Sequence, residues 1–261
     1  MTGLPRADFH IHTKHLRCAN GTMEIPAIMK ECERLGVKSL GITDHLASFD
    51  KLALHELIKQ EIEALDTDIA VYFGVELHYL SADGEFAWNA EVKEKYGFQF
   101  AIGGPHNLFV ETYDLRKIVD VQHRHHLKTC RDPLVDVLVH PYWFPKGEFD
   151  KNGWPWFESM QAVPESYARE LGQTAKETGT AIEINGTGNL TNPSFSERYV
   201  KEYIEFLSII AEEGACFSFG SDAHDIGHLK NILQTWKVAE QIHLTADHIW
   251  LPKCTPMKSA V

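Results

Sequence analysis

The sequence has few cysteines, no excess of positive charge and no long hydrophobic run. Five of its 261 residues are cysteine, and no two of them form a Cys-x-x-Cys pair. Such sparse usage is typical of reduced thiols in a cytoplasmic protein rather than of a disulfide scaffold. The formal net charge of -12 argues against broad binding to nucleic acid or to an anionic membrane, because both require a basic face.

No apolar stretch approaches the ~20 residues that span a bilayer, and residues 1–8 lack the apolar core of a signal peptide. We therefore expect a cytoplasmic protein that does not enter a membrane. The hydrophobic content of 44% is that of an ordinary globular chain. The length predicts one domain over residues 1–254, followed by a loose tail over residues 255–261. The oligomeric state stays open.

Apolar runs of strand length alternate with stretches of helical periodicity along most of the chain. The expected strands cover residues 38–43, 71–77, 98–102, 134–139, 181–185 and 216–221. The expected helices cover residues 25–35, 54–65, 115–129, 166–178, 200–211 and 229–236, and an insertion at 83–97 carries a further short helix. This alternation favours an α/β fold with parallel strands.

The stretch Asp8-Phe9-His10-Ile11-His12-Thr13 alternates apolar and imidazole side chains. An extended segment places both imidazoles on the same face. Two neutral imidazoles one step apart can hold a single divalent metal ion.

Further potential metal ligands lie within or just after other predicted strands. They are His45, Glu76, His106, His140, Asp222 and His224. In a parallel barrel the C-terminal ends of the strands meet at one rim, so ligands from distant sequence positions converge there. Any one of these histidines could be a core residue, but their shared position at strand ends favours a metal site.

Together these motifs resemble the PHP (polymerase and histidinol phosphatase) superfamily of metal-dependent phosphoesterases. The matching stretches are Asp8-Phe9-His10-Ile11-His12, Ile42-Thr43-Asp44-His45, Gly74-Val75-Glu76, Ile102-Gly103-Gly104-Pro105-His106, Val139-His140-Pro141, Glu183-Ile184-Asn185 and Gly220-Ser221-Asp222-Ala223-His224. The resemblance implies a distorted (β/α)7 TIM-like barrel with the metal site at its C-terminal rim. It also implies hydrolysis of a small phosphorylated metabolite by a metal-bridging hydroxide, with histidinol phosphate as one candidate substrate.

The resemblance also implies a ligand set for two or three divalent ions of zinc, manganese or iron. One ion takes His10, His12, Glu76 and Asp222. Glu76 bridges to a second ion with His106 and His140, and His45 and His224 contribute to a third. Asp44 is expected to accept a hydrogen bond from a metal-bound histidine or to transfer a proton. Glu183 is expected near the rim, and its role is left undecided. His78 could share the face of Glu76, but we expect it to have a structural role.

The first loop, residues 14–21, departs from the family pattern. Relatives often place a ligand of the third metal there, and His15, Cys18 and Asn20 each fit under a different alignment. We favour His15 as that ligand, with an acid that protonates the leaving oxygen as its alternative role. Arg17, and with less support Lys14, are expected to bind a substrate phosphate.

One aromatic segment and one histidine-rich segment could each serve either the structure or the function of the protein. Residues 141–157 are dense in aromatics and prolines and lie just beyond a rim ligand, so Trp143 is expected either to contact substrate or to pack. The run His123-Arg124-His125-His126 in a predicted helix is expected to form a solvated face.

Alternative functions are a nucleotide or nucleic-acid phosphodiesterase or exonuclease, and a PHP-fold regulatory module with weak activity. The acidic balance disfavours the first, and the nearly complete ligand set disfavours the second. A C–N hydrolase usually has a metal-bridging lysine on a strand, and no lysine stands out in that position.

Overall fold

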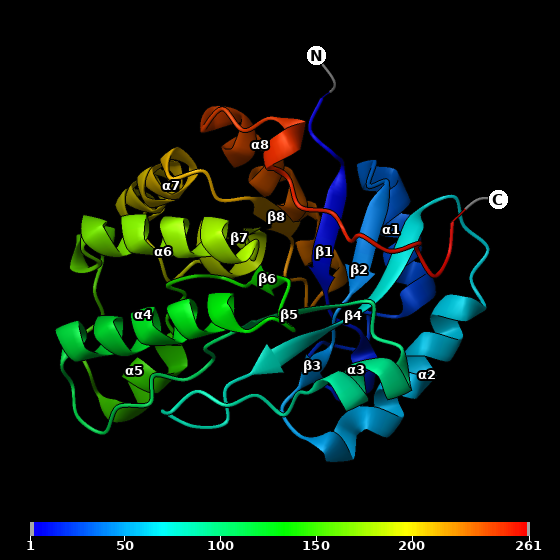
Figure 1. Ribbon diagram of the computed structural model, residues 1–261, viewed down its shortest axis with the longest axis horizontal. Helices are drawn as coiled ribbons and strands as arrows, with labels where there is room; N and C mark the ends of the chain where they lie inside the picture. Colours follow the sequence, from blue (N-terminus) through cyan, green and yellow to red (C-terminus); the bar gives the residue numbers. More distant parts are fainter. Residues whose placement is uncertain (1–2, 260–261) are drawn as a thin grey trace.

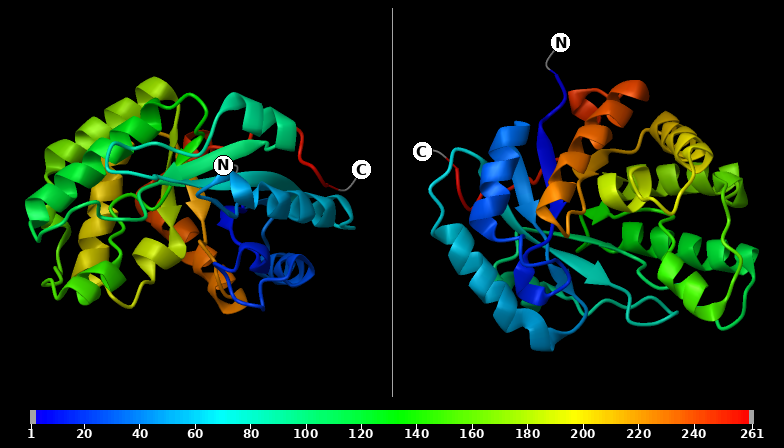
Figure 2. Two further views of the ribbon diagram at one scale, coloured as in Figure 1. Left: turned by 90° about the horizontal axis from the view of Figure 1, so that it is seen from below. Right: turned by 180° about the vertical axis from the view of Figure 1, so that it is seen from behind.

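Parallel strands form the centre of the computed structural model, which describes residues 3–259. Helices cover the outside of these strands (Figures 1 and 2). The strands are β1 (Ala7–Ile11), β2 (Ser39–Ile42), β3 (His45–Leu46), β4 (Ala70–His78), β5 (Phe100–Gly104), β6 (Val137–Leu138), β7 (Ala181–Asn185) and β8 (Phe217–Gly220).

The sheet runs in the order β1-β2-β4-β5-β6-β7-β8, and every adjacent pair is parallel. The short strand β3 extends the line of β2 and pairs with the second half of β4. Backbone hydrogen bonds from His12 N to Ala223 O and from Asp222 N to His10 O join the first and last strands at the rim. The sheet thus nearly closes on itself, which confirms the predicted distorted (β/α)7 barrel.

The helices are α1 (Ile25–Leu35), α2 (Leu52–Glu63), α3 (Ala90–Tyr96), α4 (Leu115–Arg131), α5 (Lys146–Asn152), α6 (Glu165–Thr178), α7 (Glu197–Glu212) and α8 (Ile232–Gln241). In Figure 1, α4, α6 and α7 lie on one side of the strands and α1 and α2 on the other. Within residues 3–259, no helix is both long and apolar enough to cross a membrane.

The two faces of each strand bury different side chains. Odd-numbered residues of β4, such as Val71 and Phe73, pack under the helices in the main core. A separate cluster comprises Ala7, Phe9, Phe100, Ile102, Val137, Val139, Ala181 and Trp250. Most of these residues occupy alternate positions of the strands, Val139 directly follows β6, and Trp250 comes from the C-terminal segment. This cluster fills the enclosed side of the sheet. On β4 the same alternation directs Glu76 and His78 to that enclosed side, above the apolar cluster.

Strand β1 changes its register between Asp8 and Ile11, where its pairing with β2 is irregular. Phe9 lies in the enclosed apolar cluster and Ile11 in the outer core. Such an irregularity redirects side chains locally. It allows His10 and His12 to reach the enclosed side at the rim, directly after Phe9.

The segment expected to be a loose tail is attached to the sheet up to Lys258. The backbone of Lys258 pairs antiparallel with Val71, and Val71 O accepts a hydrogen bond from Met257 N at 2.8 Å. Thr255 O accepts a further bond from Gln99 Nε2. Backbone groups of Val71, at the start of β4, and the side chain of Gln99 therefore hold this segment. The sequence pattern does not reveal these contacts. Residues 260–261 lie outside the described part of the chain.

We predict that Phe100→Ala destabilises the barrel by about 3–5 kcal/mol. The Phe100 ring occupies the space beside Gly41 and Gly74, where a Cβ at either glycine would overlap it. Its removal therefore leaves a cavity that the flanking glycines cannot fill. Urea unfolding in EDTA measures the loss without a contribution from bound metal. Phe49→Ala is the matched control, because Phe49 is 49% exposed; equal costs for both variants would contradict this packing.

Candidate metal centre

Glu76, buried on the enclosed face of β4, lies at the centre of a group of histidines. Its Oε1 is 2.9 Å from His106 Nε2 and 3.2 Å from His140 Nε2. Its Oε2 is 2.6 Å from His45 Nδ1 and 3.4 Å from His12 Nε2. Each carboxylate oxygen therefore faces a different set of imidazoles, and Oε1 also has His10 Nε2 at 3.3 Å. This is the geometry by which one carboxylate bridges two cations.

His10, His12 and Asp222 surround one side of this carboxylate. The two Nε2 atoms lie 3.0 Å apart, and His10 Nε2 is 3.3 Å from Glu76 Oε1. Asp222 Oδ1 is 3.6 Å from His10 Nε2 and 3.5 Å from His12 Nε2. The strand ends thus bring together the residues that the sequence analysis assigned to the first ion.

Glu183, whose role the sequence left open, holds the His10 side chain and the His140 backbone in position. Its Oε1 accepts a hydrogen bond from His10 Nδ1 at 2.7 Å. Its Oε2 accepts bonds from the backbone N–H of His140 at 2.7 Å and from Asn185 Nδ2 at 2.9 Å. Asn185 Nδ2 also lies 3.2 Å from Asp222 Oδ2. A histidine held through Nδ1 presents Nε2 to a metal with a defined orientation.

Two of the candidate ligands have an unusual backbone conformation. His140 has a φ of 29° and Asp222 a φ of 53°. Such angles in non-glycine residues cost of order 1–3 kcal/mol each and persist where the surroundings enforce them. The backbone N–H of Asp222 donates to His10 O at 2.8 Å. The backbone therefore departs from regular geometry at the rim, and these departures aim side chains into the site.

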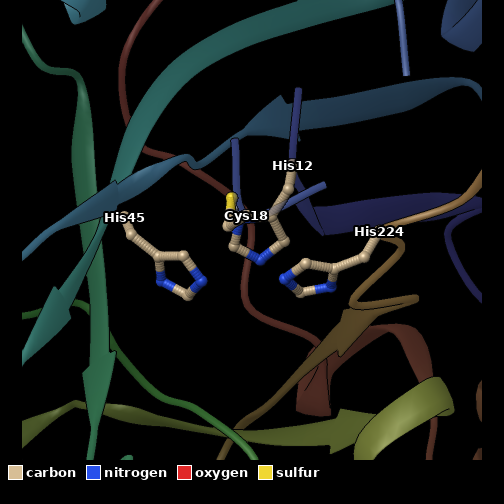
Figure 3. A group of neighbouring side chains, drawn as sticks. All are labelled: His12, Cys18, His45 and His224. Atoms are coloured by element: carbon tan, nitrogen blue, oxygen red, sulfur yellow. Dashed lines mark hydrogen bonds between the residues drawn. The ribbon is translucent and has the colours of Figure 1, made fainter. Parts of the chain in front are cut away.

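A further group of donors lies on the open side of the rim (Figure 3). One ligand atom from each residue lies within 4.8 Å of the others, and the group consists of His12, Cys18, His45 and His224. Of the first-loop candidates, Cys18 is the residue that the fold brings here. Asn20 instead joins the loops, with its backbone N–H donating to His224 O at 2.9 Å.

The other candidates of the first loop face other partners. His15 Nε2 lies 3.1 Å from Glu61 Oε1 on α2, away from the histidine groups. Lys14 Nζ forms an ion pair with Glu24 at 2.6 Å. Arg17 ends the short 3-10 turn Lys14–Leu16 with a φ of 62°, and its side chain is exposed. The structure does not bring His15 to the site in the way that the sequence analysis favoured.

His78, which we expected to be structural, belongs to the site. Its ring stacks on that of His106 with centroids 3.7 Å apart, and its Nε2 contacts His45 Nδ1. His45, Glu76, His78 and His106 form a group that could hold a metal ion. The sequence contained one indication of this position. His78 lies two residues after Glu76 in the same strand, so the two side chains point to the same face of the sheet.

Asp44 has a different partner from the expected one. Its carboxylate accepts hydrogen bonds from the backbone N–H and the hydroxyl of Thr13 at 3.1 Å. Burial raises the pKa of Asp44 to about 7. The carboxylate therefore anchors the start of the first loop, and Glu183 is the carboxylate that accepts a hydrogen bond from a ligand histidine.

Most of the aromatic segment at residues 141–157 is packed in the core. Tyr142, Phe144 and Phe149 are at most 1% exposed. Trp143 is partly exposed and borders the site, with its ring centroid 5.4 Å from that of His140 and 6.4 Å from that of His106. The packing interpretation therefore holds for most of the segment, and Trp143 lies at the boundary between the core and the histidine group.

The expectation of a solvated histidine face on α4 was wrong. His123, His125 and His126 are at most 5% exposed. His123 Nδ1 lies 2.8 Å from the Tyr142 hydroxyl, and its Nε2 lies 3.0 Å from Glu170 Oε2. Helix α4 packs against the sheet and against the neighbouring helix α6, so this face is covered by residues that are distant in sequence.

Mutual attraction of carboxylates and imidazoles shifts their pKa values. Burial alone would raise the pKa of Glu76, but His45 and His10 hold it well below its usual range. Burial would lower the pKa of His10, but Glu183 and Glu76 hold it well above its usual range. Burial would raise the pKa of Asp222, but His10, His12 and His224 together hold it below its usual range.

The donors fit divalent metal ions. Imidazole nitrogen and carboxylate oxygen suit Zn²⁺, Mn²⁺ and Fe²⁺. Among residues 3–259, the buried Oε2 of Glu76 has no hydrogen bond of acceptable geometry, although His45 Nδ1 is 2.6 Å away. Ligand atoms arranged around a cation point toward the cation and not toward one another. The short but misaligned approach of Glu76 Oε2 and His45 Nδ1 is consistent with such an arrangement.

We predict that Glu183→Gln weakens metal affinity by about 10- to 100-fold, because the hydrogen bond that orients His10 changes. Isothermal titration with Zn²⁺ and Mn²⁺ measures this effect. The control is Glu170→Gln, since Glu170 also pairs with a histidine but lies at the α4–α6 contact. Unchanged affinity in Glu183→Gln, with the fold intact by circular dichroism, would remove Glu183 from the site.

Comparison with known proteins gives one family match. Residues 8–187 match the family model described as the PHP domain. The matched range includes every candidate ligand except Asp222 and His224. No curated protein matches the chain.

Solved structures show only distant similarity. A dihydropteroate synthase from Thermus thermophilus in complex with 4-aminobenzoate is 11% identical, covering 94% of this chain and 86% of that chain, with a TM-score of 0.44. A Xaa-Pro dipeptidase with bound methionine is 10% identical, covering 98% and 77%, with a TM-score of 0.41. A dihydropteroate synthase from Coxiella burnetii in complex with pteroic acid is 12% identical, covering 92% and 94%, with a TM-score of 0.36. Values this low carry no argument about function.

Proposed function

The chain belongs to the PHP domain family, and from this premise we propose that it is a metal-dependent phosphoesterase that hydrolyses a small phosphorylated metabolite. The observation that carries the proposal is the position of Glu76. Its Oε1 faces His106, His140 and His10. Its Oε2 faces His45 and His12. Such a carboxylate can hold two cations side by side.

Bound divalent cations would supply a water activated near neutral pH and would neutralise charge on the phosphoryl oxygens. The chain's own residues supply the positions. Glu183 fixes the His10 ring through Nδ1, and it also fixes the backbone of His140. Asn185 joins this carboxylate to Asp222. No serine or cysteine nucleophile is required.

The proposal uses neither Asp44 nor His15 as a proton-transfer group. Asp44 is hydrogen-bonded to Thr13, and His15 lies against Glu61. The proton for the leaving oxygen would then come from water at the site. Proton transfer was one of two roles that the sequence analysis gave to Asp44, and for His15 it was the alternative to a metal-ligand role.

The surroundings of the site support a small, anionic substrate. The exposed rim residues are His224, whose side chain is 34% exposed, and His45, at 18%. Trp143 borders the site on the side of His106 and His140. Arg17 is an exposed cation in the loop next to His12. Phosphate esters of small metabolites, including histidinol phosphate, fit these features.

The net charge of -12 favours this class over a nucleic-acid exonuclease. A cytoplasmic location is part of the proposal. It rests on the five cysteines, all of which are free thiols in the structure.

We predict that Glu76→Gln abolishes phosphatase activity on a panel of phosphorylated metabolites, with at least a 10³-fold loss of kcat/KM, about 4 kcal/mol. A neutral amide cannot bridge two cations as a carboxylate does. Activity of the wild type should vanish in EDTA and return with Mn²⁺ or Zn²⁺. Steady-state kinetics and metal analysis provide the measurements.

The matched control is Glu24→Gln, which removes an exposed carboxylate paired with Lys14. Wild-type turnover in Glu76→Gln, or wild-type protein that binds no metal and hydrolyses no phosphate ester, would refute the proposed function.

We also predict that Arg17→Ala raises KM for a phosphorylated substrate by about 10-fold, with metal content unchanged, since one charge-assisted contact is worth about 1.5–3 kcal/mol. Arg17→Lys should recover only part of this loss, because lysine lacks the paired donors of arginine. Lys14→Ala is the control, since Lys14 is paired with Glu24. Equal KM values in all variants would show that Arg17 faces solvent during turnover.

A further inference from the structure

We propose that Cys18 is a thiolate ligand at the third cation position, which the family resemblance assigns to His45 and His224 and which lies on the open side of the rim. The position would prefer a thiophilic ion such as Zn²⁺ or Co²⁺ to Mn²⁺ or Mg²⁺. The proposal deepens the proposed function, because it concerns the same site. Among its ligands, His45 also lies beside Glu76, with its Nδ1 2.6 Å from Oε2, whereas Cys18 enters the site from the first loop.

The geometry places the sulfur among imidazoles from three other segments. Ligand atoms of His12, Cys18, His45 and His224 lie within 4.8 Å of one another. The His12 ring centroid is 4.1 Å from that of His224 and 4.4 Å from that of His45. In Figure 3, His45 and His224 lie on opposite sides of the pair formed by Cys18 and His12.

The contacts of His12 show that it belongs to the Glu76 group through one nitrogen and faces the sulfur through the other. Its Nε2 lies 3.4 Å from Glu76 Oε2 and 3.5 Å from Asp222 Oδ1. Its Nδ1 lies 3.9 Å from Cys18 Sγ. When Nε2 binds a metal, the proton resides on Nδ1 and can be donated toward the sulfur. His12 therefore supports the thiolate, and Cys18, His45 and His224 remain as ligands.

The loop that carries Cys18 is fixed at both ends. On one side, Asp44 accepts the backbone N–H and hydroxyl of Thr13 at 3.1 Å. On the other, the backbone N–H of Asn20 donates to His224 O at 2.9 Å. The second contact ties the cysteine loop directly to a histidine of the same group. The sulfur is thus held in place by the fold rather than left on a free loop.

Two imidazoles, one thiolate and an open position match the donor set that zinc commonly takes in proteins. Soft thiolate ligands favour zinc-like ions, whereas carboxylate and water favour Mg²⁺ and Mn²⁺. On binding, the sulfur–metal bond forms as the thiol proton passes to solvent.

The first test is titration of metal-free protein with Co²⁺. Wild-type protein should develop a near-ultraviolet thiolate-to-cobalt absorption, and Cys18→Ser should lose that band and one equivalent of bound Co²⁺ per chain. Cys254→Ser is the matched control, since Cys254 is also an exposed free thiol but lies beside Gln99; it should keep both. Cys18→His should recover the lost equivalent without the band, because imidazole can replace the thiolate as a ligand.

The preference is tested by metal analysis after dialysis against Zn²⁺ or Mn²⁺. Wild-type protein should retain one more equivalent of Zn²⁺ than of Mn²⁺, and this difference should disappear in Cys18→Ser. An unchanged Co²⁺ band in Cys18→Ser, or equal stoichiometry in wild type and variant, would overturn the inference.

The proposed function can fail separately. Absence of phosphatase activity with the Cys18-dependent band still present would refute the function and leave the ligand assignment intact. Glu76-dependent hydrolysis without that band would do the opposite.

Discussion

The site depends on one buried carboxylate, that of Glu76, which imidazoles from several strand ends share. A buried charge is tolerated only when it is paired and well coordinated. Here the pairing comes from His10, His45 and His106, with further histidines around them. The remaining polar residues of the rim act on these partners. Glu183 orients the His10 ring, and Asn185 connects the Glu183 carboxylate to that of Asp222.

The enclosed side of the sheet is divided between two kinds of side chain. Near the strand starts, an apolar cluster that includes Phe9, Phe100 and Trp250 packs with regular alternation. Toward the strand ends, β1 changes register and His140 and Asp222 adopt positive φ. A Cβ at Gly220 would overlap the Glu183 carboxylate and crowd His10, so a glycine is required there. The apolar half packs regularly and supports the rim. At the rim, the strained backbone of His140 and Asp222 directs their side chains into the site.

Two donors at the site, His78 and Cys18, lie outside the motif stretches on which the family resemblance rests. His78 adds an imidazole beside His45 and His106, and Cys18 brings a sulfur to the open group. Both enlarge the set of donors around an otherwise familiar arrangement. The first loop carries the sulfur and the exposed Arg17, so metal preference and substrate contact would be set by a short segment without disturbing the barrel.

The sequence by itself determined the parallel α/β fold and the convergence of its strand-end ligands. Periodicity identifies strands and helices, and parallel strands bring residues such as His10 and Glu76 to the same rim wherever they lie in the chain. Only the tertiary structure decided that Glu183 rather than Asp44 supports a ligand, that Cys18 rather than His15 reaches the open group, and that His126 is buried. These outcomes depend on loop dihedrals and on helix rotation against distant neighbours. A local residue pattern does not specify which distant side chain a given residue will contact.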